Sequence, residues 1–300
     1  MSSRLSVNSI LVIGGAGFLG KNFIETLLSK DDYKISSFDL APSNLLPKKQ
    51  SLTGSILDEA ALSKAMADVD IVCHFAGMAD IEECTESPVK AVQSNVLGAT
   101  MVMDACVKSN VKRLIFASSV YASTNLGGVY RSTKLACESL LKDYQKYYDL
   151  DYTILRYGTL YGRGANQKNS IHRFLNEALK ENKIHYQGNG LEMREYIHVL
   201  DAAELTIEAM KKEHANKTLI LTGQKETMVK DLFAMISEIL GKDIEVEYKD
   251  PTQKQLLKSH YSTTPYSYIK DMSKKLVVNE YIDLGRGLLD CIEGIENDRS

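Results

Sequence analysis

The feature that most constrains the fold of this chain is a glycine-rich turn that directly follows a short apolar segment. Residues 10–13 are all apolar, as in a strand buried on both faces of a parallel sheet. Residues 14–20 follow with the spacing Gly-x-x-Gly-x-x-Gly, and apolar residues then recur with helical spacing up to Leu28. Such a turn lets backbone N–H groups approach a pyrophosphate at the positive end of the helix. The segment predicts a dinucleotide site; the alternative is a strand–helix turn that merely contains glycine.

An aspartate at the end of the second predicted strand indicates which dinucleotide binds. Residues 35–38 form this strand, and Asp39 ends it nineteen residues after Gly20. A carboxylate at this point can accept hydrogen bonds from the adenosine ribose and would repel a 2′-phosphate. No arginine follows Asp39 directly. The pattern favours NAD over NADP, and the alternative is that Asp39 is an exposed loop residue.

Strand and helix patterns alternate through the first half of the chain. Residues 70–77 and 111–117 have the pattern of buried strands that end in small residues. A long helix is predicted after Pro88, with Val89 and Val92 on its buried stripe and Asn95 interrupting that stripe. A buried amide needs partners, so Asn95 is either a polar link in the core or a support for an active site. The alternation predicts an α/β fold with a Rossmann-type, doubly wound parallel sheet.

Tyr130 and Lys134 carry the chemistry that this sheet would position. They lie four residues apart on a predicted helix and therefore share one face. An ammonium group there can lower the pKa of the phenol, and a phenolate formed near neutral pH can take a proton from a sugar hydroxyl. Taken alone, Tyr-x-x-x-Lys is a weak pattern, so its meaning depends on the motifs around it.

The composition argues against several classes of protein. The chain has 300 residues, 44% of them hydrophobic, and a net charge of −3, which gives no reason to expect nucleic acid or a membrane as partner. The apolar run near the amino terminus is too short for a signal peptide or a membrane span, so we expect a cytoplasmic protein. The five cysteines are an odd number without a Cys-x-x-Cys pair, and the six histidines lack ligand spacing. We therefore expect neither a disulfide frame nor a metal site.

Taken in order along the chain, these motifs resemble those of the extended short-chain dehydrogenase/reductases. The chain is most similar to their NAD-dependent epimerase/dehydratase branch, which acts on nucleotide sugars. The resemblance rests on the glycine turn, Asp39, residues 74–77, Asn95, the pair Ser118 and Ser119, and the spacing of Tyr130 and Lys134. It continues through residues 155–162 and 194–201, and so covers almost the whole chain.

The resemblance implies a role for particular residues. Tyr130 would be the acid/base, Lys134 the ribose-binding lysine and Ser119 the active-site hydroxyl, with Ser118 as the alternative. The residues that would bind or line the NAD site are Gly14, Gly17, Phe18, Leu19, Gly20, Asp39, Ile56, Phe75, Ala76, Gly77, Asn95, Tyr130, Lys134 and Tyr157. The residues that would contact the nucleotide sugar are Ser119, Thr159, Asn169 and Arg194.

The chain departs from the family pattern at a few positions. Ser55 stands where an aspartate is usual, Thr159 where an asparagine is common, and Gly158 where an aromatic residue is common. Only ten residues lie between Ser119 and Tyr130, which keeps Ser118 a candidate for the active-site hydroxyl. These departures bear on which sugar is bound.

The resemblance also implies a division of the chain. Residues 1–158 would form the NAD-binding domain, to which the chain returns in part around residues 191–221. Residues 159–300 would form mainly a small C-terminal substrate-binding lobe. Within that part we predict a helix after Asn169, an edge strand over residues 244–248, a loop over residues 261–268 and a final helix over residues 284–295.

The favoured activity is 4-epimerisation of a UDP-sugar, of the glucose/galactose type or its N-acetyl form, through a transient 4-keto intermediate. The alternatives are a reductase, dehydratase or decarboxylase of the same family, or a non-catalytic NAD-binding regulator. A 4,6-dehydratase would need an additional acid pair beside the active-site hydroxyl, whereas Val120 and Tyr121 follow Ser119. In relatives the helix that carries the lysine packs against its own copy, which implies a homodimer.

Overall fold

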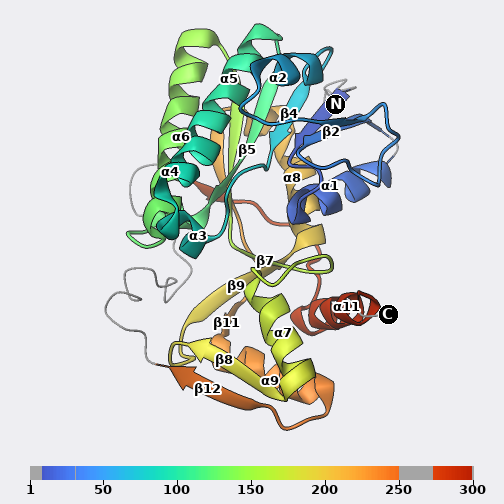
Figure 1. Cartoon of the computed structure of the whole chain (residues 1–300), viewed down its shortest axis with the longest axis vertical. Helices are drawn as coiled ribbons and strands as arrows, with labels where there is room; N and C mark the ends of the chain where they lie inside the picture. The colour runs from blue at the N-terminus through green and yellow to red at the C-terminus, as the bar shows by residue number, and fades with distance from the viewer. Residues whose placement is uncertain (1–8, 31, 250–272, 299–300) are drawn as a thin grey trace.

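The computed structural model describes residues 9–30, 32–249 and 273–298. Its centre is an eight-stranded sheet with the strand order β13-β10-β6-β5-β4-β1-β2-β3, in which every neighbouring pair is parallel (Figure 1). The strands are β1 (Ser9–Ile13), β2 (Lys34–Asp39), β3 (Ser51–Thr53), β4 (Ile71–His74), β5 (Arg113–Ser119), β6 (Tyr152–Tyr157), β10 (Lys217–Leu221) and β13 (Lys274–Lys275). The order reverses at β1, so the gap beyond the carboxyl ends of β1 and β4 is the place where a doubly wound sheet binds ligands.

The central strands are apolar on both sides because helices cover both faces of the sheet. On β1, Ile10 and Val12 belong to one core cluster, and Leu11 and Ile13 belong to another. Helices α1 (Phe18–Leu28) and α8 (Val199–Ala209) pack on the first face. Helices α2 (Glu59–Ala65), α5 (Gly98–Lys108) and α6 (Gly128–Tyr148) pack on the second. The predicted Rossmann-type α/β fold is confirmed.

Three further helices and five further strands form a smaller unit beyond the carboxyl edge of the large sheet (Figure 1). Strands β7 (Thr159–Tyr161), β9 (Met193–His198) and β11 (Glu226–Met228) make a three-stranded sheet, and β8 (Lys183–Gln187) pairs in parallel with β12 (Glu245–Lys249). Helices α7 (Ser170–Glu181), α9 (Val229–Leu240) and α11 (Leu284–Asn297) enclose a third core cluster with these strands. The predicted helix after Asn169, edge strand and final helix are all present.

Several short strands were not predicted, among them β3 and β13 of the large sheet. β3 lies inside the polar connection between Pro42 and Gly54, and β13 brings the chain back to the large sheet a second time, after β10. Neither strand has more than three residues, so neither shows a periodic pattern in the sequence. The loop predicted over residues 261–268 lies outside the described residues.

The helix predicted after Pro88 is wrong in its buried stripe. The segment divides into α4 (Pro88–Ala91), the π-helix η1 (Val92–Leu97) and α5. Val89 is 78% exposed and Val92 49% exposed, whereas Asn95 is buried. A π-helical turn inserts an extra residue into the helical repeat, so the side chains before it rotate away from the core. Asn95 lies within this turn.

Candidate active site

The glycine turn between β1 and α1 is closely packed against the end of β4. A Cβ added to Gly14, which has φ of +90°, would lie 2.6 Å from the backbone nitrogen of Ala76. A Cβ on Gly20 would lie 2.1 Å from the Gly14 carbonyl oxygen. Only glycine fits either position, because the clash in each case is with backbone. The turn is therefore fixed by two elements that are far apart in sequence.

The start of α1 is suited to a phosphate group. Gly17 stands at the N-cap without a side-chain hydrogen bond and is exposed, so the first N–H groups of the helix, starting at Phe18 and Leu19, have no capping side chain. By contrast, Asp58 and Asp80 cap α2 and α3 (Ile81–Glu86) with their carboxylates. An uncapped helix start next to a glycine turn fits the pyrophosphate of a dinucleotide.

Asp39 lies beside this turn, at the end of β2. Its Oδ2 accepts a hydrogen bond of 2.9 Å from the Ala16 N–H, and its Oδ1 accepts one of 2.6 Å from the Leu40 N–H. The side chain is partly exposed, so lone pairs of both oxygens remain for ribose hydroxyls. The structure thus places Asp39 beside the glycine turn, and its binding of the adenosine ribose stays a prediction.

The other residues expected to line the cofactor site lie around the carboxyl edge of the sheet in different ways. The Phe75 ring packs edge-on against Phe23 of α1, with centroids 5.3 Å apart. The Ile56 side chain packs over Gly98, where a Cβ would lie 2.4 Å from its Cδ1. Gly77 has φ of +148°, and a Cβ there would lie 2.8 Å from Oδ1 of Asn95. Glycine at position 77 thus keeps the edge open next to Asn95.

The Asn95 side chain is a bridge between this edge and the helix that carries Tyr130. Its Oδ1 accepts from the Met78 N–H at 2.7 Å, and its Nδ2 donates to the Met78 carbonyl at 2.9 Å and to Oγ1 of Thr133 at 3.1 Å. Both predicted alternatives, a polar link and a support for the site, therefore describe the same residue. The π-helical turn aims this amide inward, as such turns often do at functional sites.

Tyr130 and Lys134 lie on the buried face of α6 and are 9% and 8% exposed. The Lys134 ammonium donates a 2.8 Å hydrogen bond to the carbonyl of Ala117 on β5, and it lies 5.7 Å from the centre of the Tyr130 ring. The Tyr121 ring packs edge-on against Tyr130, with centroids 6.4 Å apart. The lysine, the phenol and the end of β5 thus converge at the carboxyl edge of the sheet.

The prediction that Lys134 lowers the pKa of Tyr130 is wrong for this structure. Burial raises the pKa of the Tyr130 phenol to about 12, and the nearby Ser119 hydroxyl offsets only part of that rise. Burial also lowers the pKa of Lys134, whose ammonium is directed at a backbone carbonyl. Removal from water disfavours the charged forms of both groups, and it is the largest cause of both shifts.

The two serines at the end of β5 face different partners. The Ser118 hydroxyl donates a 2.5 Å hydrogen bond to Oε1 of Glu138, and it is buried. The Ser119 hydroxyl faces the Tyr130 phenol and accepts from the Tyr121 N–H at 3.3 Å. The geometry therefore favours Ser119 over Ser118 as the active-site hydroxyl, because the Ser118 hydroxyl is directed into a buried carboxylate.

The residues expected to contact substrate lie near the junction of the two units. Thr159 begins β7, directly after the large sheet. Asn169 caps α7: its Oδ1 accepts from the His172 N–H at 3.2 Å, and its Nδ2 donates to the Leu160 carbonyl at 2.7 Å. Arg194 lies buried on β9 and donates to the Met193 carbonyl at 3.0 Å.

Tyr157, expected to line the cofactor site, turns its hydroxyl away from the carboxyl edge. The hydroxyl lies 2.6 Å from Oγ1 of Thr206 on α8, and the ring belongs to the core under that helix. Burial raises the pKa of this phenol. Only the main chain of Tyr157 is left to contact a cofactor.

His74, on β4, is packed as the sequence predicted and has a consequence for acid stability. It is 2% exposed, and burial, followed by the charge of Lys134, lowers its pKa to about 3. Below pH 6.5 this histidine is protonated in the unfolded chain but stays neutral in the folded chain. The free energy of unfolding should therefore fall as the pH drops from 6.5 towards 3, by about 2 kcal/mol at pH 5.

The variant His74→Phe should lack this part of the pH dependence. Urea unfolding gives the free energy of unfolding of both proteins at pH 7 and pH 5. The value for the variant minus the value for the wild type should be about 2 kcal/mol more positive at pH 5 than at pH 7. An equal difference at both pH values would show that His74 is not held neutral in the fold.

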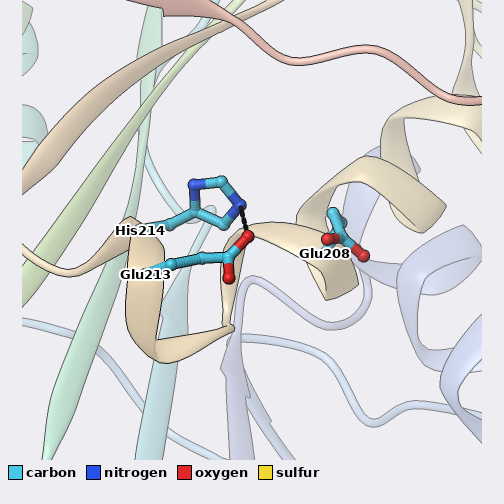
Figure 2. Close-up of side chains that lie close together, drawn as sticks. All are labelled: Glu208, Glu213 and His214. Carbon is cyan, nitrogen blue, oxygen red and sulfur yellow. Dashed lines mark ion pairs between the residues drawn. The ribbon is translucent and has the colours of Figure 1, made fainter. Parts of the chain in front are cut away.

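Some histidine and carboxylate side chains lie close together away from this site. Figure 2 shows Glu208, Glu213 and His214, whose ligand atoms lie within 4.8 Å of one another. Glu208 is already paired with Lys211 at 2.6 Å, and His214 lies 3.7 Å from Glu213. Glu208 lies in the last turn of α8, and Glu213 and His214 lie in the short helix η3 (Lys212–His214) before β10, at the amino edge of the sheet. The group is therefore separate from the carboxyl-edge site.

The sequence profile of the NAD dependent epimerase/dehydratase family matches residues 10–221 of the chain, from β1 to the end of β10. The chain belongs to this family. It is therefore an NAD-dependent enzyme, and the glycine turn, the uncapped start of α1 and Asp39 are the part of the NAD dependent epimerase/dehydratase fold that fits the cofactor.

Members of the NAD dependent epimerase/dehydratase family that are similar to this chain catalyse more than one reaction. A UDP-glucose 4-epimerase of Yersinia enterocolitica is 32% identical over 65% of this chain and 71% of its own length. A dTDP-glucose 4,6-dehydratase of Actinoplanes sp. is 24% identical over 77% of this chain and 82% of its own length.

The fold is shared with solved structures of the family. The UDP-glucuronic acid 4-epimerase from Bacillus cereus, in complex with UDP-glucuronic acid and NAD, matches with a TM-score of 0.81 at 21% identity, over 96% of this chain and 99% of its own. In the described ranges 9–30, 32–249 and 273–298, none of the helices has the length and apolarity that crossing a bilayer requires.

Proposed function

We propose that this enzyme is a 4-epimerase of UDP-sugars. The observation that carries the proposal is the convergence of the Tyr130 phenol, the Ser119 hydroxyl and the Lys134 ammonium at the carboxyl edge of the sheet, next to the glycine turn. A sugar placed between this group and the cofactor would present one hydroxyl to the phenol. The ring carbon behind that hydroxyl would then face the site of oxidation.

In the first half of the reaction Tyr130 takes the proton of the sugar 4-hydroxyl. When bound, NAD would supply the positive charge of its nicotinamide ring, which favours the phenolate, and a reversible acceptor for the hydride of carbon 4. Ser119 donates a hydrogen bond to the sugar oxygen, which becomes a carbonyl in a 4-keto intermediate. In the second half the sugar has turned its other face toward the cofactor, and Tyr130 returns its proton to that oxygen.

Lys134 has two tasks in this scheme. Its ammonium is held by the Ala117 carbonyl, so it lies at the end of β5, within reach of a cofactor ribose that spans the carboxyl edge. It also supplies a positive charge near the phenol. Burial disfavours both charged groups in the protein without cofactor, and the positive nicotinamide ring of bound NAD would favour the phenolate.

The residues after Ser119 argue for epimerisation over dehydration. Val120 is 1% exposed and Tyr121 8% exposed, and both are packed into the core cluster that contains Tyr130. Neither of the two residues that directly follow the active-site hydroxyl is therefore a carboxylate that could protonate a leaving hydroxyl group. A nucleotide-sugar reductase is less well supported, because Asp39 beside the glycine turn would repel the 2′-phosphate of NADP. A decarboxylase and a non-catalytic regulator remain as outcomes of the tests.

The smaller unit is proposed to bind the nucleotide sugar. Arg194 on β9 and Asn169 at the start of α7 would lie along the diphosphate, and Thr159 would face the sugar. An arginine fork suits a diphosphate, and a helix start favours negative charge. The NAD-binding part would be residues 1–158 with the returning elements, and residues 159–300 would be mainly the substrate-binding lobe.

A homodimer is proposed through the surface formed by α4, η1 and α6. Val89, Val92 and Leu97 are exposed there, and Val92 lines a groove together with Val129 and Ala136. Exposed apolar side chains that continue along two neighbouring helices are typical of a helix–helix interface between subunits.

The variant Leu97→Asp is therefore expected to convert the dimer into a monomer, because a carboxylate would be buried without a partner in the interface. Sedimentation equilibrium at micromolar concentration measures the change, and Leu289→Asp on the exposed side of α11 is the matched control. A wild-type protein that is monomeric, or a Leu97→Asp variant that stays dimeric, would contradict the proposed interface.

The proposed activity is tested by incubating the enzyme with UDP-glucose, UDP-N-acetylglucosamine, UDP-glucuronic acid and dTDP-glucose, and separating the products by chromatography. We expect interconversion of one gluco/galacto pair of UDP-sugars without net consumption of NAD. Loss of water would indicate a dehydratase, loss of carbon dioxide a decarboxylase, and consumption of NADPH a reductase; each result would overturn the proposal.

A further inference from the structure

Directly behind the phenol and the active-site hydroxyl lies a buried ion pair that the proposed chemistry does not use. Arg156 on β6 donates two hydrogen bonds to Glu138 on α6: Nε to Oε1 at 3.0 Å and Nη2 to Oε2 at 2.6 Å. Both side chains are 4% exposed. The Ser118 hydroxyl donates to the same carboxylate at 2.5 Å, and Nη1 of Arg156 donates to the Ser123 hydroxyl at 3.0 Å.

These contacts connect the elements that carry Tyr130, Lys134 and Ser119. Glu138 lies one helical turn after Lys134 and two after Tyr130, on the same buried face of α6. Arg156 is the register partner of Ser118, which precedes Ser119 on β5. Ser123 ends the short helix η2 (Val120–Ser123), which begins directly after Ser119. The pair therefore joins the helix of the phenol to both sides of the hydroxyl.

A pair of this kind contributes orientation more than stability. Taking two charges out of water costs several kcal/mol, which their attraction roughly offsets when the geometry is bidentate and the remaining lone pairs are filled. What a bidentate fork does fix is the distance and angle between the two elements that carry it. Here those elements are α6 and β6, with β5 and η2 attached through serine hydroxyls.

We propose that Glu138 and Arg156 are positioning residues that hold the Ser119 hydroxyl against the Tyr130 phenol and keep the charge beside Lys134 balanced. The proposal rests on the proposed function, since it assigns these residues to the same reaction. Neither residue contacts a reacting atom; each acts through Tyr130, Ser119 or Lys134. A loss of the pair would let the end of β5 move relative to α6.

The charge balance gives the proposal a measurable signature. Glu138 is one of the groups that raise the pKa of Lys134, although burial lowers it overall. The ionisable side chains around Lys134 are Tyr130, Cys137 and Glu138 on α6, Cys84 on α3, His74 on β4, and Arg156 through its pair with Glu138. Neutralising Glu138 removes a nearby negative charge and leaves the Arg156 cation uncompensated. Both changes lower the pKa of Lys134.

The test compares Glu138→Gln, Glu138→Asp and the control Thr153→Val in the full-length enzyme loaded with NAD. Thr153 lies on the same strand as Arg156 and is equally buried, but its hydroxyl bonds to the His214 carbonyl at the amino edge of the sheet. We expect Glu138→Gln to lower kcat by about 10-fold to 100-fold while KM stays within about twofold. The alkaline limb of its kcat–pH profile should move to lower pH by about one unit.

In Glu138→Asp the alkaline limb of the kcat–pH profile should return to its wild-type position, because the negative charge is present. The kcat of this variant should stay lowered, because the shorter side chain cannot keep the bidentate geometry. Thr153→Val should lower the melting temperature without a change in kcat or in the pH profile. If Glu138→Gln does not fold, the Glu138→Asp variant decides: a wild-type kcat in that variant would overturn the positioning role.

A readout without substrate separates this proposal from the proposed function. The ammonium of Lys134 can be titrated by NMR with ¹³Cε-labelled lysine, with its signal assigned by its absence in Lys134→Met. A lower Lys134 pKa in Glu138→Gln than in the wild type supports the charge balance even if no UDP-sugar is converted. Equal titration of Lys134 in both proteins, or a kcat and pH profile of Glu138→Gln that match the wild type, would overturn the proposal.

Discussion

Replacing Tyr130 with phenylalanine is expected to lower kcat by about 10³-fold, because the variant has no group that can take and return the proton of the sugar hydroxyl. The ring contacts of Tyr130 are with Tyr121 and the core around Cys84, and phenylalanine preserves them. The circular dichroism spectrum and the Kd for NAD should therefore match those of the wild type.

Tyr144→Phe is the matched control, since Tyr144 lies on the same helix and its ring packs against Tyr148 at 5.0 Å. This control should keep the wild-type kcat. A Tyr130→Phe variant with wild-type turnover would show that another group moves the proton. If the Tyr130→Phe variant performs the biological role of the protein unchanged, that result would instead support the non-catalytic regulator.

Replacing Asp39 with alanine is expected to weaken NAD binding by about 100-fold. The carboxylate would bond the adenosine ribose through its charged oxygens, and a hydrogen bond to a charged group contributes about 1.5–3 kcal/mol. The variant also removes the acceptor of the Ala16 N–H, so the glycine turn loses one of its fixed contacts. Isothermal titration calorimetry measures the effect directly.

NADP provides the contrast that identifies the cause. Without the carboxylate the 2′-phosphate is no longer repelled, so Asp39→Ala should bind NAD and NADP with similar affinity. Asp283→Ala, which removes the aspartate that caps α11, is the control and should leave both affinities unchanged. An Asp39→Ala variant that keeps its preference for NAD over NADP would place the ribose elsewhere.

Much of the fold could be predicted because its elements are marked by local patterns. The glycine turn is recognisable from spacing alone, and β4, β5 and β6 are apolar runs that each follow a helix. The short strands β3 and β13 could not be predicted, because strands of two or three residues carry no period and depend on the neighbouring strand for their formation. The π-helical turn at Asn95 was missed for a similar reason: it changes the helical repeat without a residue type that marks it.

The residues that form the candidate site could be predicted from the sequence better than their pKa values could. The structure brings Tyr130, Lys134 and Ser119 together and places Asp39 beside the glycine turn, while their roles stay predictions. Burial raises the pKa of the phenol, an effect that residue spacing does not reveal. The pair of Glu138 and Arg156 was not singled out at all. Its signal was present, since Glu138 continues the four-residue spacing of Tyr130 and Lys134 on α6, but its partner is on a strand distant in sequence.

The most direct test of 4-epimerisation follows one atom, the hydrogen isotope at carbon 4 of the sugar. The enzyme is incubated with UDP-glucose that carries deuterium at carbon 4, without added NAD, and the product is analysed by NMR and mass spectrometry. If Tyr130 and the bound cofactor oxidise and reduce the same carbon, the product is UDP-galactose with deuterium still at carbon 4 and none lost to water. Deuterium found at carbon 6 with loss of water, or exchanged with the solvent, would contradict 4-epimerisation at this site.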